Sequence, residues 1–70
     1  MKNFGERLKD ALLDAGYTQS EFARSIGLDR MWLNHILKGR KEPSLKSLVK
    51  ILKGLPAGTS IRYLICGIEG

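Results

Sequence analysis

The chain has too little cysteine for an internal disulfide and no apolar run of the length that a membrane helix needs. Its one cysteine, Cys66, suits a reducing compartment. Cys66 lies in the apolar stretch 61–68, so we expect a buried structural thiol. The first residues also lack the apolar core of a secretory signal peptide. These absences predict a cytoplasmic protein that has no membrane partner.

Residues that carry catalytic or metal chemistry are also sparse. The chain has one histidine and seven acidic residues, and they form no serine–histidine–aspartate set and no convincing carboxylate pair. There is no glycine-rich phosphate loop. His35 has no second histidine or cysteine at ligand spacing, so we expect neither a metal nor a cofactor. Enzymatic function therefore has little support.

What the chain does contain is positive charge, most of it in one window. The net charge of the whole chain is +5. Between Arg30 and Lys53, seven basic residues stand beside one acid, Glu42, so this window carries +6 and the rest of the chain −1. Neutralisation of phosphates requires a clustered excess of this kind. The charge distribution thus predicts a polyanionic partner.

Hydrophobic periodicity predicts an all-α fold of five helices in a single domain, residues 1–70. The helices are expected at about 4–15, 19–26, 30–38, 45–53 and 61–66, and Thr18, Asp29, Ser44 and Ser60 are their expected N-caps after the first. In the fourth helix the apolar residues are expected to face inward: Leu45, Leu48, Val49, Ile51 and Leu52. Its three lysines are expected to face outward: Lys46, Lys50 and Lys53.

Residues 18–38 carry the most informative pattern, two short helices separated by one glycine. Thr18 and Glu21 form a capping box at the start of the first helix. Gly27 follows where a chain that leaves a helix needs a positive φ, and Asp29 begins the second helix. This arrangement is typical of a helix-turn-helix, whose second helix enters the major groove of DNA. The pattern predicts double-stranded DNA as the partner and residues 29–38 as the recognition helix.

The chain resembles lambdoid phage repressors and Cro proteins, and small bacterial regulators of that type, over about residues 4–67. The matching segments are Arg7-Leu8-Lys9, Thr18-Gln19, Glu21-Phe22-Ala23, Gly27-Leu28, Lys38-Gly39 and Pro43-Ser44-Leu45. The resemblance implies a compact repressor-like domain that regulates transcription in a bacterial cell or a phage-infected host. Where relatives often carry an internal arginine–glutamate ion pair, this chain has Leu12 and Leu37, which we expect to meet in the core.

The resemblance and the helical geometry together select the DNA contacts. Base contacts fall on Arg30, Met31 and His35, with Asn34 as a further candidate. Arginine can donate two hydrogen bonds to guanine, asparagine can pair with adenine, and methionine can pack on a thymine methyl group. The candidates for the DNA backbone are Gln19, Trp32, Lys38, Arg40 and Lys41. For Trp32, packing against a neighbouring helix is an equally weighted alternative.

Relatives bind palindromic operators as two-fold dimers, and the resemblance implies the same here. The apolar residues near the end of the chain exceed what a six-residue helix can bury, so we expect a dimer surface at Ile61, Tyr63, Leu64, Ile65 and Ile68. In the competing interpretation, all five cover the core. An alternative function is a protein-interaction module of the same fold, such as the antitoxin of a toxin–antitoxin pair.

Overall fold

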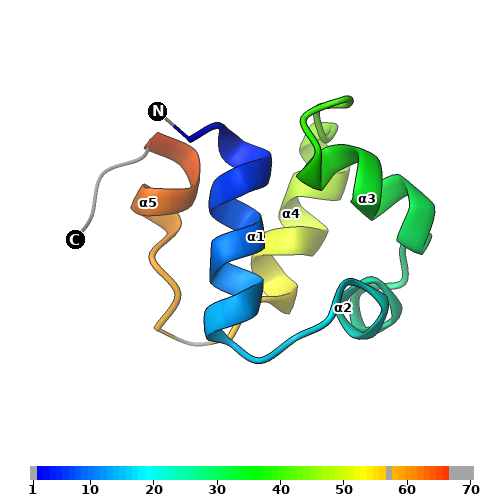
Figure 1. Cartoon of the computed structure of the whole chain (residues 1–70), viewed down its shortest axis with the longest axis horizontal. Coiled ribbons are helices and arrows are strands. Elements are labelled where there is room, and N and C mark those ends of the chain that lie inside the picture. Colours follow the sequence, from blue (N-terminus) through cyan, green and yellow to red (C-terminus); the bar gives the residue numbers. More distant parts are fainter. Residues whose placement is uncertain (1, 57, 67–70) are drawn as a thin grey trace.

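The structure, a computed structural model, describes residues 2–56 and 58–66. Its helices are α1 (Phe4–Asp14), α2 (Gln19–Ile26), α3 (Arg30–Leu37), α4 (Leu45–Gly54) and α5 (Ile61–Cys66). The described residues contain no strand, so the predicted all-α fold of five helices is confirmed. Figure 1 shows α1 in the middle, with α5 on one side and α2 and α3 on the other. None of these helices is long and apolar enough to cross a membrane.

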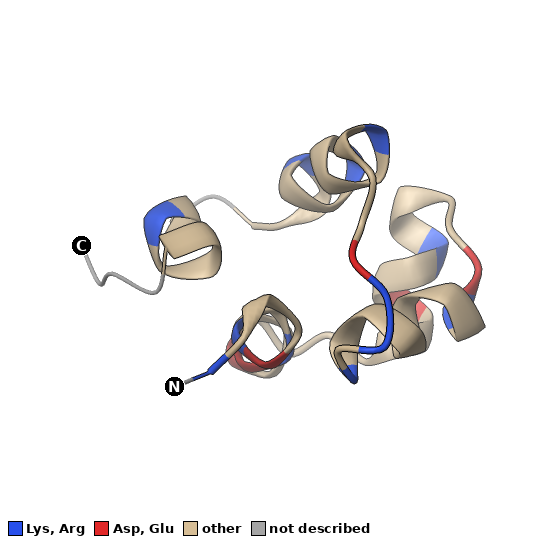
Figure 2. Ribbon diagram, turned by 90° about the horizontal axis from the view of Figure 1, so that it is seen from above, with Lys and Arg blue, Asp and Glu red and all other residues tan. Residues whose placement is uncertain are grey.

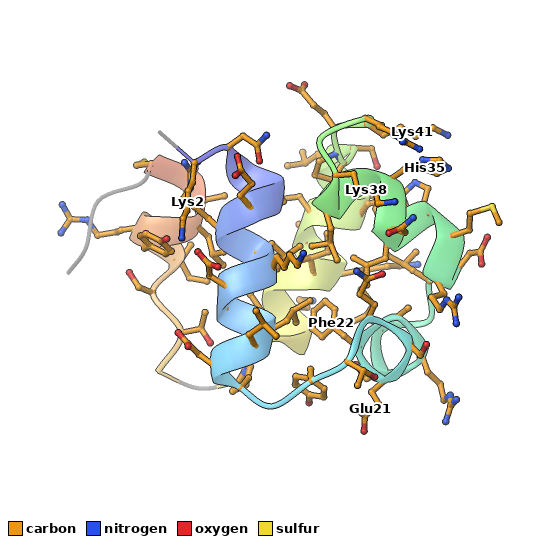
Figure 3. All side chains as sticks on the ribbon, in the orientation of Figure 1. Lys2, Glu21, Phe22, His35, Lys38 and Lys41 are labelled. Carbon is orange, nitrogen blue, oxygen red and sulfur yellow. The ribbon has the colours of Figure 1, made fainter. Side chains whose placement is uncertain are left out.

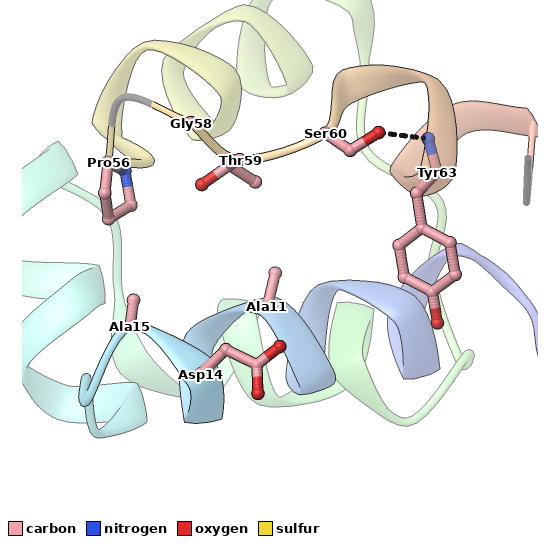
Figure 4. Close-up of a pocket in the computed structure, with 8 residues that line it drawn as sticks. All are labelled: Ala11, Asp14, Ala15, Pro56, Gly58, Thr59, Ser60 and Tyr63. Carbon is pink, nitrogen blue, oxygen red and sulfur yellow. Dashed lines mark hydrogen bonds between the residues drawn. The ribbon is translucent and has the colours of Figure 1, made fainter. Parts of the chain in front are cut away.

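Helix boundaries follow from local capping bonds. The Thr18 hydroxyl accepts from the Glu21 N–H at 3.1 Å, and the Glu21 carboxylate accepts from the Thr18 N–H at 3.0 Å. The predicted capping box is therefore confirmed. Ser44 caps α4 as predicted. At α5, the Ser60 hydroxyl accepts from the Tyr63 N–H at 3.1 Å (Figure 4).

One cluster of buried side chains joins the helices. Its members are Leu8, Leu12, Phe22, Ala23, Leu33, Ile36, Leu37, Ile51, Leu55 and Leu64. The Phe22 side chain points from α2 into the interior (Figure 3), where it is fully buried. Leu12 and Leu37 belong to this cluster, on two helices that pack against each other. Aliphatic side chains at these positions bury no charge, so no desolvation cost arises.

Helices α1 and α3 approach each other closely at Gly5. A Cβ atom on residue 5 would lie 2.3 Å from the Ile36 carbonyl oxygen and 2.8 Å from the Leu37 carbonyl oxygen. Both obstacles are backbone atoms of α3, which cannot rotate away as a side chain could. The absence of a side chain at Gly5 therefore sets how closely the C-terminal end of α3 rests on α1.

Arg7 joins α5 to α1. Its Nε donates to the Leu64 carbonyl at 2.9 Å and its Nη2 donates to the Ile65 carbonyl at 3.3 Å. Its Nη1 donates to the Lys2 carbonyl. The last carbonyls of a helix have no partner within the helix, and the Arg7 guanidinium supplies partners for two of them. In the sequence, Arg7 is notable only as part of a segment that matches the family.

Several apolar side chains that were expected inside are exposed. Leu45 is 78% exposed and Val49 is 41% exposed, whereas Ile51 is fully buried. At 100° per residue, the five apolar residues of α4 spread over about 160° of the helix circumference. The neighbouring helices cover only part of that arc, so the inward assignment of Leu45 and Val49 was wrong. The expectation of a buried Cys66 was also wrong, because its thiol lies on the surface at the last residue of α5.

Candidate nucleic-acid interface

The candidate interface consists of α2, α3 and the turn between them. Gly27 ends α2 with φ at 72°, the left-handed conformation that glycine adopts without strain. Asp29 then caps α3 by accepting a hydrogen bond from the Met31 N–H at 3.3 Å. Figure 1 shows α2 end-on while α3 runs across the view, so the two helices cross steeply. The predicted helix–turn–helix geometry of residues 18–38 is present.

Helix α3 has one buried face and one open face. Leu33, Ile36 and Leu37 are buried in the core. Met31, which is exposed, and His35, which is half-buried, lie on the opposite side of the helix. Asn34 is half-buried on the flank, and Arg30 is the exposed first residue of α3, so the four predicted base contacts spread over about 140° of the helix circumference. Met31 is a large apolar side chain that is 66% exposed, and it is chemically suited to packing against a thymine methyl group.

Residues from the start of α2 extend this face. Gln19 and Ser20 line a shallow groove of about 320 Å³ together with Arg30, Met31 and Asn34. Arg30 Nη1 donates to the Ser20 hydroxyl at 3.4 Å, a long and exposed bond that can be exchanged for a bond to nucleic acid. Backbone N–H groups at a helix N-terminus favour an anion, which suits Gln19 to a phosphate contact. Ser20 is not among the contacts predicted from the sequence, although it stands next to Gln19.

A basic rim lies at the other end of α3. Lys38, Arg40 and Lys41 are all exposed. Gly39, with φ at 75°, turns the chain after α3, and the Arg40 N–H donates to the His35 carbonyl at 2.9 Å. Figure 3 shows Lys38 and Lys41 at the same end of α3 as His35, and Figure 2 shows the basic loop beside that helix. Cations therefore flank the candidate base contacts, where phosphates would lie.

Trp32 lies at the edge of the open face. It is partly buried and packs against the core cluster. This position favours the packing alternative over a purely sugar-phosphate role. Contact between the exposed part of its ring and the DNA backbone stays a prediction.

Among the residues that the structure describes, two titratable groups have clearly shifted pKa values, and both lie away from the open face of α3 (Figure 3). Hydrogen bonds from Thr18, first from its backbone N–H, lower the pKa of the Glu21 carboxyl. A hydrogen bond to Asp10, followed by the attraction of its charge, raises the pKa of Lys2. These shifts reflect a helix cap and a surface ion pair, so they belong to the scaffold of the domain.

The candidate dimer residues that the structure describes differ in how exposed they are. Leu64 points from α5 into the core and is fully buried. A side chain without exposed area cannot contact a second chain, so the assignment of Leu64 to a dimer surface was wrong. Ile61 is 43% exposed and Ile65 is 44% exposed, and Tyr63 is half-buried. Ile68 lies outside the described residues. Neither of the two sequence interpretations holds for all of the described α5 residues.

A separate groove of about 450 Å³ lies between α1 and the segment that connects α4 to α5 (Figure 4). Its lining residues are Ala11, Asp14, Ala15, Pro56, Gly58, Thr59, Ser60 and Tyr63. Asp14 is the one charged residue of this set, and a carboxylate repels phosphate. This groove is therefore not part of the candidate DNA interface.

Comparison with known proteins agrees with this geometry. A family model described as helix-turn-helix matches residues 8–64. The chain is also 38% identical over 64 residues to the SPbeta prophage-derived HTH-type transcriptional regulator YonR of Bacillus subtilis strain 168. That match covers 91% of this chain but 57% of the relative, so the chain spans little more than half of the relative's length. No solved structure matches the chain significantly. The chain belongs to the helix-turn-helix family, in the group of phage repressors and Cro proteins.

Proposed function

We propose that this protein binds double-stranded DNA sequence-specifically and regulates transcription as a phage-type repressor or Cro-like protein. In this proposal α3 enters the major groove with Arg30, Met31, Asn34 and His35 toward the base edges. The observation that supports the proposal is the exposed side of α3, where Arg30, Met31 and Asn34 line one shallow groove with Gln19 and Ser20, opposite the helix positions that are buried in the core. Membership of the helix-turn-helix family supports the same function.

The DNA backbone would be held on both sides of the recognition helix. Gln19 lies at the start of α2, and Lys38, Arg40 and Lys41 lie at the end of α3 and in the following loop. These side chains supply hydrogen-bond donors and three positive charges. Phosphate contacts of this kind fix the position of the helix in the groove without distinguishing sequences.

Two copies of the chain would share one operator. The described part of the chain measures 30 × 24 × 20 Å, which is less than the about 34 Å of one DNA turn. One recognition helix contacts only a few base pairs, too few to specify a site in a genome. We therefore propose a homodimer on a palindromic operator, joined through Ile61, Tyr63 and Ile65.

Selection of bound sequences from a pool of random duplexes tests this function. We expect one enriched half-site, repeated in inverted orientation about one helical turn apart. The same selection with Asn34→Ala should lose enrichment at one position of the half-site only. If no sequence is enriched, or if affinity for duplex DNA does not fall with salt, DNA recognition is excluded and the protein-interaction module becomes the better explanation.

A further inference from the structure

The exposed side of α4 combines aliphatic and basic side chains that the proposed DNA contacts do not use. Leu45 is 78% exposed and Val49 is 41% exposed. Lys46, Lys50 and Lys53 are exposed as well, and α4 contains no acidic residue. We call these five residues the α4 face. In Figure 2 the basic residues of α4 lie on the outer side of the molecule.

The two kinds of side chain are separated on the helix. At 100° per residue, Leu45 and Val49 fall along one edge of the exposed arc, and the three lysines fall along the other. Beyond the aliphatic edge lies Leu48, which lines a groove of about 370 Å³. The other residues of this groove are mostly apolar, with Asn3, Lys41 and Glu42 as its polar members: Asn3, Phe4, Gly5, Ile36, Gly39, Lys41, Glu42, Pro43 and Ile65. The α4 face thus lies between a largely apolar groove and a row of cations.

Simpler explanations do not account for this combination. A single exposed leucine is ordinary on a protein surface, but Leu45 and Val49 lie one helical turn apart along the row of lysines. Phosphates gain nothing from aliphatic neighbours. A second copy of the chain is also disfavoured, because two-fold pairing of this face would bring two rows of three lysines together. The charge and the apolar edge together fit a partner that is both acidic and amphipathic.

We propose that the α4 face docks an acidic amphipathic helix of a partner protein. Aliphatic residues spaced one turn apart on the partner pack against Leu45 and Val49, and one of them enters the groove beside Leu48. Carboxylates on the adjoining side of the partner helix pair with Lys46, Lys50 and Lys53. The surface is small, so the association is weak and transient.

A synthetic peptide serves as the probe. It carries leucines one helical turn apart and glutamates on the adjoining side, and its control has the same composition in scrambled order. By fluorescence anisotropy, we expect the striped peptide to bind at least about tenfold more tightly than the scrambled one. Two double variants, Leu45→Ser with Val49→Ser and Lys46→Glu with Lys50→Glu, should each weaken binding about tenfold. Their thermal unfolding should match the parent chain, since the altered side chains are exposed.

Matched controls on α1 separate this proposal from nonspecific attraction. Leu13 is 65% exposed and Lys9 is exposed, so Leu13→Ser and Lys9→Glu should leave peptide binding unchanged. In amide NMR spectra, the peptide should shift signals of residues 45–53. Equal binding of the scrambled peptide, or shifts confined to α3, would overturn the proposal in favour of simple attraction of an anion to the DNA-binding surface.

Two further results would reassign the α4 face. Unchanged peptide binding combined with weaker duplex binding in the Lys46→Glu, Lys50→Glu variant would make this face a phosphate contact. A lower sedimentation mass in the Leu45→Ser, Val49→Ser variant, again with unchanged peptide binding, would make it a contact between copies of the chain. Either result excludes an acidic partner helix.

Discussion

At the scale of single residues, Arg30 is the proposed base contact and Lys41 the proposed phosphate contact that can be compared most directly. Arg30 is the exposed first residue of α3, whereas Lys41 lies in the loop after that helix. We expect Arg30→Ala to cost about 1–3 kcal/mol on the preferred duplex and to relax base preference there. Lys41→Ala should weaken binding to all duplexes alike and reduce the salt slope by about 1. Anisotropy titrations on preferred and scrambled duplexes at several salt concentrations measure both effects.

The comparison between the two duplexes decides the role of Arg30. If Arg30→Ala weakened the preferred and the scrambled duplex equally, its guanidinium would be a phosphate contact. The hydroxyl of Ser20, which accepts a hydrogen bond from Arg30, offers a milder change. Ser20→Ala should shift base preference less than Arg30→Ala, because it removes only a positioning bond.

The Glu21 carboxyl links pH to stability. Its pKa is lowered in the folded protein because it accepts a hydrogen bond from the Thr18 N–H at 3.0 Å. The stabilisation is therefore complete above the ordinary pKa of 4.5 and is lost as the pH falls through the lower, folded-state value. Glu21→Gln keeps an acceptor at this position of the capping box but does not titrate. We expect its free energy of unfolding, from urea titrations, to fall less steeply below pH 4.5 than that of the parent chain.

Residue-scale features were predictable where they depend on near neighbours in the sequence. Thr18, Asp29 and Ser44 cap helices as predicted, because a cap is a contact between residues two or three positions apart. The capping box of Asn3 and Glu6 at α1 follows the same pattern and could have been found in the same way. The open face of α3 was predictable too, since three buried positions determine which side faces out.

At the scale of helices, the sequence predicts that a helix exists and where it ends better than it predicts how the helix packs against its neighbours. The same apolar spacing that identifies α4 as a helix does not say how much of its circumference the neighbours cover. Leu45 and Val49 are exposed for this reason. Arg7 illustrates a second kind of feature that the sequence does not predict. Its hydrogen bonds reach carbonyl groups of α5 that lie 57 and 58 positions further along the chain. No local pattern indicates such a contact.

The hydrogen bonds of Arg7 lead us to expect that this residue stabilises α5. Arg7→Met keeps an unbranched side chain but removes the donors to the Leu64 and Ile65 carbonyls. We expect faster amide hydrogen exchange in α5, with exchange in α2 and α3 close to that of the parent chain. Arg62→Met, which alters an exposed residue of α5 itself, is the matched control and should change exchange much less. Uniformly faster exchange in all helices would mean that Arg7 supports the whole core instead.

At the scale of the whole molecule, three surfaces have separate chemistry. The open face of α3 carries hydrogen-bonding groups and Met31, the α4 face carries lysines beside aliphatic residues, and α5 exposes Ile61 and Ile65. The exposed side of α3 was the one predictable from the sequence, because the buried positions of that helix determine which side faces out. The α5 surface was predicted by counting apolar residues, and counting could not show that Leu64 would be the one buried.

In the proposed dimer, the α5 surface joins the two chains. On a symmetric operator we expect two chains per duplex with cooperative binding, measured by titration of labelled duplex and by sedimentation. Ile65→Asp places a charge on the exposed apolar surface, so it should abolish cooperativity and leave affinity for a single half-site unchanged. Leu13→Asp places the same charge on an exposed leucine of α1 and should preserve cooperativity.

The half-site measurement is what distinguishes the dimer from the monomer. A small apolar contact gives weak association without DNA, so a monomer in dilute solution is compatible with a dimer on the operator. When DNA holds two chains side by side, their effective concentration rises and the same contact becomes sufficient. One chain per operator, without cooperativity and unchanged by Ile65→Asp, would exclude the dimer. Affinity for the full operator would then equal that for two independent half-sites, and α3 alone would have to supply all specificity.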